Sequence, residues 1–132
     1  MKVLIIIPAY NEQDSIANVV NNIYSKYENI DVVVINDGSK DNTLIEAKKT
    51  KATVIDLPCN LGIGGAMQTG YLYAFQNSYD IAIQVDADGQ HDVSYVKDMI
   101  ELINSEQANM VIGSRFIENT GYKQTFARML RY

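Results

Sequence analysis

Short, nearly continuous runs of Val and Ile alternate along the chain with segments in which apolar residues recur every three or four positions. The continuous runs predict five β-strands, at residues 2–9, 31–36, 52–57, 81–85 and 110–113. Parallel strands that are covered on both faces have this uninterrupted hydrophobicity. We therefore expect a mostly parallel sheet.

The segments between these runs predict helices. Apolar residues follow helical spacing at Ile16, Val19, Val20, Ile23 and Tyr27, and again at Val96, Met99, Ile100 and Ile103. Asp41 or Asn42 is placed to cap a helix that runs to Lys49, and residues 62–76 form a further helix that opens with glycines. The alternation of strands and helices predicts a single α/β domain over residues 1–132, with right-handed crossovers.

The end of the chain has a different pattern. Residues 122–132 predict an amphipathic helix with Phe126, Met129 and Leu130 on one side, and no Gly or Pro stop signal follows it. Because nothing downstream covers this apolar stripe, we expect the chain to be truncated, the N-terminal part of a longer protein. Pairing of two chains through the stripe, as a homodimer, is the other interpretation.

Composition limits the function classes. With 132 residues, 47% of them apolar, the chain has enough material for one core, and its net charge of −5 argues against a nucleic-acid partner. A single cysteine, Cys59, excludes an internal disulfide, and we expect it to be a small buried residue. The first residues do not resemble a cleavable signal, and no apolar run approaches the roughly 20 residues that span a bilayer. We therefore expect a cytoplasmic protein.

Basic residues gather near the end of the chain. Arg115, Lys123, Arg128 and Arg131 face a single acidic residue there, Glu118. Such a segment is either a solvated helix face or a surface for phosphate or for an anionic membrane, and the sequence leaves both interpretations open.

The most informative chemistry follows the fourth predicted strand. Asp86 and Asp88 are two residues apart, so their carboxylates point the same way and repel each other. Mg²⁺ or Mn²⁺ relieves that repulsion, because both ions prefer carboxylate oxygen and share their coordination with phosphates. Taken alone, such a pair is also typical of ordinary turn aspartates.

Polar groups follow the other predicted strands as well, at the sheet edge where ligands bind in open parallel sheets. Asp37 and Glu12 suit the N–H groups of a base or the hydroxyls of ribose, and Tyr10 offers a ring for stacking. Arg115 suits the oxygens of a departing diphosphate. Together these groups predict a nucleotide-diphosphate site. Purely structural roles for two of these residues also remain open. Glu12 could be an acidic residue in the first turn of a helix, where it interacts favourably with the helix dipole, and Asp37 could simply begin a turn.

Five short segments occur in order along the chain: Pro8-Ala9-Tyr10-Asn11-Glu12, Asn36-Asp37-Gly38-Ser39, Asn60-Leu61-Gly62, Asp86-Ala87-Asp88-Gly89-Gln90-His91 and Gly113-Ser114-Arg115. With these segments the chain resembles a family 2 glycosyltransferase of the GT-A fold, and is similar to dolichyl- and polyprenyl-phosphate sugar transferases. The resemblance implies a Rossmann-like fold that binds a nucleotide-sugar.

The resemblance also implies roles for individual residues. Metal ligands for Mn²⁺ or Mg²⁺ are Asp86, Asp88 and Gln90, and the catalytic residues are Asp88 and Arg115. Residues implied in donor binding are Pro8, Ala9, Tyr10, Glu12, Asp37, Asn60, Gly62, Asp86 and Ala87. We expect His91 to face solvent or to support the site rather than to bind the ligand, and Asp92 to cap the next helix.

The reaction implied is the inverting transfer of a sugar from a UDP- or GDP-linked donor. The acceptor is a lipid phosphate or a glycan, as in the assembly of cell-envelope polysaccharide, at the cytoplasmic face of a membrane in the full-length protein. The family's general base and acceptor segments lie beyond Tyr132. We therefore expect this chain to bind donor and to turn over poorly or not at all.

Other classes fit less well. A dinucleotide-binding dehydrogenase would need glycine at Met67, in a motif after the first strand. An EF-hand would need glycine at His91 and glutamate at Lys97. A sugar-nucleotide synthesising transferase would carry a glycine-rich loop with a basic residue after the first strand. A donor-binding module without turnover remains the main alternative.

Overall fold

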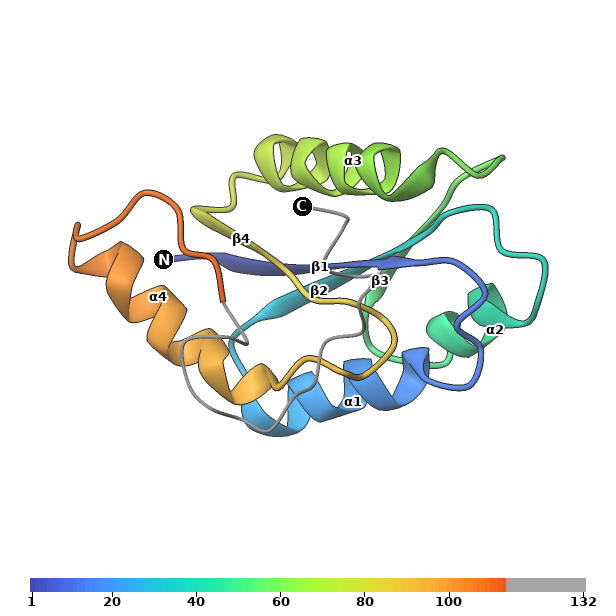
Figure 1. The fold of residues 1–132 in the computed structure, drawn as a ribbon, viewed down its shortest axis with the longest axis horizontal. Coiled ribbons are helices and arrows are strands. Elements are labelled where there is room, and N and C mark those ends of the chain that lie inside the picture. The colour runs from blue at the N-terminus through green and yellow to red at the C-terminus, as the bar shows by residue number, and fades with distance from the viewer. Residues whose placement is uncertain (114–132) are drawn as a thin grey trace, which may run out of the picture. The chain divides into compact units, whose positions relative to one another are not determined.

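The computed structural model describes residues 1–113 of the 132-residue chain. These residues belong to two compact units, of which the first comprises residues 1–97. In order, the first unit contains β1 (Val3–Ala9), α1 (Ile16–Lys26), β2 (Asp31–Asn36), α2 (Thr43–Lys48), β3 (Thr53–Asp56), α3 (Gly62–Gln76), β4 (Ile81–Gln84) and the 3₁₀ turn η1 (Val93–Tyr95) (Figure 1). The last helix, α4 (Val96–Asn104), crosses the boundary between the units.

The four strands form one parallel sheet in the order β3-β2-β1-β4. The chain therefore adds β2 and β3 on one side of β1, and then crosses to place β4 on the other side. This reversal makes the gap between the carboxyl ends of β1 and β4 a topological switch point, the place where open α/β sheets bind their ligands. The predicted α/β class and parallel sheet are confirmed.

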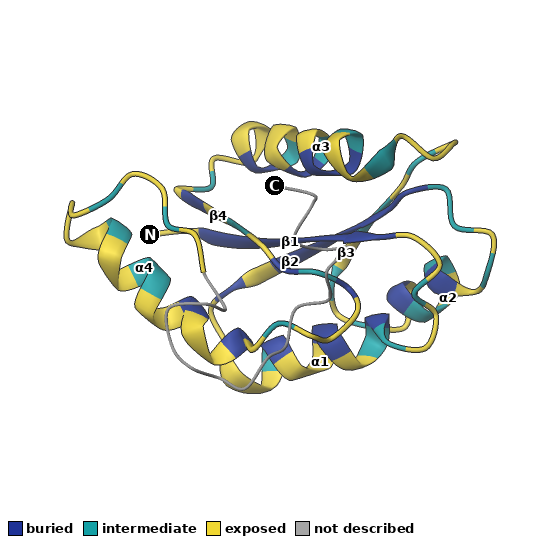
Figure 2. Ribbon diagram, viewed as in Figure 1, coloured by how far each residue is buried: buried dark blue, intermediate teal, exposed yellow. Residues whose placement is uncertain are grey.

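Helices cover both faces of the sheet, with α3 on one face and α1 and α2 on the other (Figure 1). Every residue of β1 is buried, and so are all but the first of β2, as their Val- and Ile-rich sequences predict (Figure 2). The core beneath α3 consists of Leu4, Ile6, Val33, Ile35, Ala66, Met67 and Ala74. These contacts fix the position of α3 above β1 and β2.

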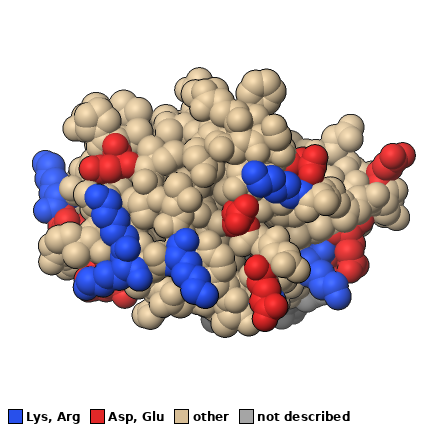
Figure 3. All heavy atoms as spheres, turned by 180° about the vertical axis from the view of Figure 1, so that it is seen from behind, with Lys and Arg blue, Asp and Glu red and all other residues tan. Residues whose placement is uncertain are grey.

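The outer face of α3 is uncharged, because the helix contains no Asp, Glu, Lys or Arg. Viewed from behind, the molecule shows no charged side chains along its upper edge, where α3 lies (Figure 3). Four large hydrophobic side chains of this helix are exposed, those of Ile63, Tyr71, Leu72 and Phe75. None of the helices in the described part of the chain has the length and hydropathy needed to cross a membrane.

Predicted and observed elements agree closely in the first unit. The glycine-opened helix spans residues 62–76 as predicted, and Asn42 is the N-cap residue of α2. Asp41 supplies the polar group at this cap, because its Oδ1 accepts a hydrogen bond of 2.9 Å from the Thr43 N–H. Asp92 also behaves as predicted and accepts from the Ser94 N–H.

The fifth predicted strand was wrong. Residues 110–113 are not a strand, and Met110 and Ile112 are 78% and 76% exposed. A strand needs a hydrogen-bonded neighbour, and the sheet among the described residues ends at β4. The predicted helix at residues 122–132 lies outside the described residues.

Candidate functional site

A pocket of about 340 Å³ lies at the carboxyl ends of β1 and β4, at the switch point of the sheet. Its lining residues are Pro8, Ala9, Tyr10, Glu12, Asp37, Ile63, Ala66, Gln84, Asp86, Ala87 and Asp88. Eight of these are predicted site residues, seven for donor binding and Asp88 for the metal, which the fold brings together from three separate segments. Most of the predicted chemistry therefore converges on this one pocket.

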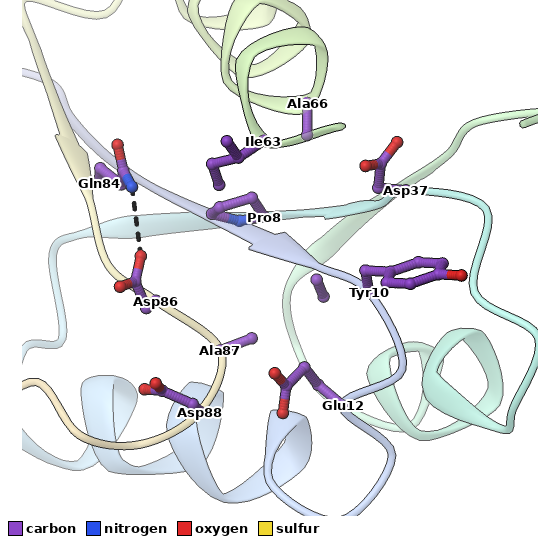
Figure 4. A pocket seen from close by; sticks show the side chains of 11 residues that line it. Pro8, Tyr10, Glu12, Asp37, Ile63, Ala66, Gln84, Asp86, Ala87 and Asp88 are labelled. Carbon is purple, nitrogen blue, oxygen red and sulfur yellow. Dashed lines mark hydrogen bonds between the residues drawn. The ribbon is translucent and has the colours of Figure 1, made fainter. Parts of the chain in front are cut away.

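The pocket has two chemically different ends (Figure 4). Tyr10 and Asp37 lie at one end, and Asp86 and Asp88 lie at the other. Between them, Pro8 and the α3 residue Ile63 form an apolar wall. A ligand that spans this pocket meets a ring and a carboxylate at one end and a pair of carboxylates at the other.

Loop-to-loop hydrogen bonds build the end that carries Tyr10. The Asn11 N–H donates to Ser39 Oγ at 3.0 Å, and Asn11 Oδ1 accepts from the Lys40 N–H at 2.9 Å. The Glu12 N–H donates to Oγ1 of the fully buried Thr43 at 2.8 Å. The loop after β1 is thus fastened to the loop after β2, which places Tyr10 at the same end of the pocket as Asp37.

Asp41 supports this connection from behind. Its carboxylate accepts from the N–H and hydroxyl of Thr43, and from the Gln13 N–H at 3.3 Å. Desolvation opposes ionisation, but these hydrogen bonds outweigh it and lower the pKa of Asp41. Ionised Asp41 therefore stabilises the loop arrangement that holds Glu12.

Asp37 is buried, only 4% exposed, and one of its oxygens is already engaged. Oδ1 accepts a hydrogen bond of 2.7 Å from the Leu61 N–H. The next residue, Gly38, has a φ of +66°, and a Cβ there would lie 2.6 Å from the Asn60 nitrogen. Glycine is required at this position, because the loop after β3 passes directly against it.

The predicted donor residues Asn60 and Gly62 do not line the pocket. Asn60 Oδ1 accepts from the Gly62 N–H at 3.0 Å, so the two residues shape the start of α3. Cys59, expected to be buried, is exposed, because it is the Cys59 backbone that packs against Gly38.

Local hydrogen bonds shape the loop that carries Asp86 and Asp88. Asp86 Oδ1 accepts from Gln84 Nε2 at 3.2 Å, and Asp88 Oδ1 accepts from the Gln90 N–H at 2.9 Å. Ser15 Oγ lies 2.7 Å from the Ala87 carbonyl oxygen, to which it donates. The side chain of Gln90, a predicted metal ligand, is not among those that line the pocket.

The pocket is acidic. Four carboxylates line it, those of Glu12, Asp37, Asp86 and Asp88, and no Lys, Arg or His from residues 1–113 does so. Across these same residues, no cluster of three His, Cys, Asp or Glu side chains forms a complete metal cage. Two carboxylates nevertheless fit Mg²⁺ or Mn²⁺, because such ions are held by one or two carboxylates together with phosphate and water oxygens.

Sequence reasoning missed three lining residues. Gln84 lies two residues before Asp86, so the two-residue period of a strand could have placed it on the same side. Ile63 and Ala66 are apolar residues in the first turns of α3, and no chemical signal distinguishes them from core residues. Arg115 lies outside the described residues.

Comparison with known proteins identifies a family whose sequence pattern the chain shares. The sequence profile of the family described as Glycosyl transferase family 2 matches residues 4–131. The chain is 39% identical over 131 residues to a UDP-N-acetylglucosamine–dolichyl-phosphate N-acetylglucosaminyltransferase of Methanococcus voltae, covering 86% of this chain and 51% of that protein. It is 32% identical to an undecaprenyl-phosphate mannosyltransferase of Micrococcus luteus, covering 87% and 49%. The chain thus spans about half the length of these relatives.

A solved structure shares the fold. The glucosyl-3-phosphoglycerate synthase of Mycobacterium tuberculosis, crystallised with Mn²⁺, UDP-glucose and phosphoglyceric acid, superposes with a TM-score of 0.63 at 25% identity. The match covers 77% of this chain and 39% of that one.

Proposed function

This chain belongs to glycosyl transferase family 2, and we propose that its pocket binds the diphosphate donor of a sugar transfer together with a divalent cation. The observation that carries the proposal is the two-ended pocket at the switch point. One end offers hydrogen-bond acceptors and a ring to a nucleoside, and the other offers paired carboxylates. A nucleoside diphosphate carries its base at one end and its phosphates at the other, so it matches this division of the pocket.

Charge supports the dependence on metal. A diphosphate is an anion, and the pocket presents it with four carboxylates and no basic side chain from residues 1–113. Like charges at close range disfavour binding unless a cation stands between them. Asp86 and Asp88 would hold Mn²⁺ or Mg²⁺, with Gln90 as a third ligand. The metal, when bound, neutralises charge on the departing nucleoside diphosphate.

At the nucleoside end, Asp37 has the decisive chemistry. Since Oδ1 is taken by the Leu61 N–H, Oδ2 is left to accept an N–H of the base. Tyr10, 43% exposed, would stack on the base, and Glu12 would accept from ribose hydroxyls. We favour a uridine donor over a guanosine donor. The Methanococcus relative is named for UDP-N-acetylglucosamine, and the mycobacterial structure was crystallised with UDP-glucose.

For the whole protein we propose inverting transfer of the sugar to a lipid phosphate at the cytoplasmic face of a membrane. The two relatives named for dolichyl and undecaprenyl phosphate support this acceptor over a glycan. Arg115 would stabilise the leaving diphosphate. Because the chain spans about half of these relatives, we expect it to act as one donor-binding domain with little or no turnover of its own.

Calorimetry tests the donor site directly. UDP and GDP are titrated into the chain with Mn²⁺ and with chelator, beside the variants Asp88→Ala and Glu28→Ala. Glu28 is an exposed acidic residue at the opposite edge of the sheet, so its variant controls for the loss of one negative charge. We expect UDP binding that needs Mn²⁺, is lost in Asp88→Ala and persists in Glu28→Ala. Equal UDP binding by Asp88→Ala would refute the proposed metal site.

A further inference from the structure

We propose that His91 is a positioning residue that holds the Asp86 carboxylate in the orientation from which it binds the metal and diphosphate. The inference rests on the proposed function of the pocket. His91 is the only histidine in the sequence, and it does not line the pocket. Its contacts with Asp86 give it a role in the site nevertheless.

The first contact fixes the backbone. The Val85 N–H still donates to the Ile6 carbonyl at 3.0 Å, which continues the pairing of β4 with β1. The next N–H, that of Asp86, has left the sheet and donates instead to His91 Nδ1 at 3.1 Å. The imidazole therefore replaces a strand partner at the point where the metal-binding loop begins.

The second contact concerns the carboxylate. A ring nitrogen that accepts a hydrogen bond carries no proton, so the proton of the neutral imidazole lies on Nε2. Nε2 is 3.5 Å from Asp86 Oδ2, while Gln84 Nε2 donates to the other oxygen, Oδ1, at 3.2 Å. The carboxylate is thus held between two polar groups, one before it in the chain and one after it.

This arrangement assigns His91 a supporting role and not a ligand role. Its Nδ1 is occupied by the Asp86 N–H, and its Nε2 faces a carboxylate oxygen. The Asp86 side chain is 40% exposed, so without such partners it would sample several rotamers before binding. Partners that orient a metal-binding carboxylate typically raise metal affinity about 10- to 100-fold.

A spectroscopic test uses the single imidazole. In tag-free protein labelled with ¹⁵N-histidine, long-range ¹H–¹⁵N correlation reports one ring. We expect the tautomer protonated at Nε2, with Nδ1 unprotonated. A ring protonated at Nδ1 in the neutral form would overturn the inference, because that nitrogen could not accept from the Asp86 N–H.

Two substitutions separate positioning from simple stabilisation. Asparagine places an oxygen close to the position of His Nδ1, so His91→Asn keeps an acceptor for the Asp86 N–H but lacks the Nε2 proton. We expect His91→Asn to retain nearly the wild-type Tm and to bind UDP with Mn²⁺ about 10-fold more weakly. His91→Ala loses both contacts, and we expect a lower Tm and affinity at least as weak.

Control measurements distinguish a failure of the His91 inference from a failure of the proposed function. UDP affinity measured with chelator should be the same in all three proteins, because His91 acts on the metal ligand. If wild-type protein binds UDP with Mn²⁺ and His91→Asn binds it equally well, the positioning role is wrong and the proposed function stands. If wild-type protein shows no metal-dependent nucleotide binding, the proposed function is wrong. The positioning role of His91 is then wrong as well, even if the ring has the expected tautomer.

Discussion

Gly70 of α3 packs directly against Ile6 of the sheet, and Gly70→Ala should destabilise the protein. A Cβ added there would lie 2.3 Å from Ile6 Cγ2, with two further Ile6 carbons at 3.2 and 3.3 Å. Ile6 lies in β1 and is 0% exposed, so its branched side chain has no free space into which to turn. Either α3 must move away from the sheet or Ile6 must leave its rotamer.

The magnitude follows from two opposing effects. Alanine is favoured over glycine in a helix by about 1 kcal/mol. Overpacking a buried site costs about 1–3 kcal/mol or more, and a 2.3 Å contact with a fixed methyl group belongs at the upper end. We therefore expect a net loss of about 2 kcal/mol of unfolding free energy, which lowers Tm by roughly 5–10 °C.

Thermal and urea unfolding provide the measurement, and the same helix provides the control. A Cβ at Gly64 would meet nothing within 4 Å, so Gly64→Ala should leave stability unchanged or raise it by up to about 1 kcal/mol. Ile6→Ala removes Cγ2, and the double variant Gly70→Ala with Ile6→Ala should be more stable than the sum of the single effects predicts. If Gly70→Ala were as stable as wild type, the close packing of α3 on β1 described here would be wrong.

Two further predictions concern the nucleoside end. Asp37→Ala leaves the Leu61 N–H without its acceptor and should cost about 1–3 kcal/mol of stability, whereas Asp37→Asn keeps an oxygen there and should lose UDP affinity about 10-fold or more with a smaller change in Tm. Equal effects of both variants on Tm and affinity would contradict this separation. The lowered folded-state pKa of Asp41 means that its stabilisation is complete above its unfolded pKa, near 3.8, and is lost as pH falls through the lower folded value. Asp41→Asn should therefore lower Tm at pH 7 and make a progressively smaller difference as pH falls below about 3.8, and a Tm difference that stayed constant with pH would exclude this role for the Asp41 charge.

The strands and the main features of the site could be predicted because they depend on local pattern. Continuous Val and Ile runs identified β1 and β2, whose burial on both faces leaves no room for polar residues. Ligands bind at the carboxyl ends of parallel strands, and this rule predicted that Tyr10, Asp37 and Asp86 lie together although they come from distant segments. Neither step required knowledge of packing.

The remainder could not be predicted because it depends on contacts between segments. The apolar run at 110–113 matched a strand, but pattern alone does not supply the neighbour that a strand requires. Asn60 follows a strand and is polar, as several of the lining residues are. Its loop nevertheless packs against Gly38, and its side chain accepts from the Gly62 N–H at the start of α3. His91 was expected to face solvent or to support the site, and only the structure identifies the Asp86 N–H as the group that donates to its ring.

Ser15 connects the loop after β1 with the loop after β4. Its hydroxyl lies 2.7 Å from the Ala87 carbonyl oxygen and 3.0 Å from Glu12 Oε2. A hydroxyl has one proton to donate, so these two acceptors compete for it. A ligand that donates to Glu12 would satisfy that carboxylate and leave the proton to Ala87, between Asp86 and Asp88. One side chain at the start of α1 thus links Glu12 to the loop that carries Asp86 and Asp88.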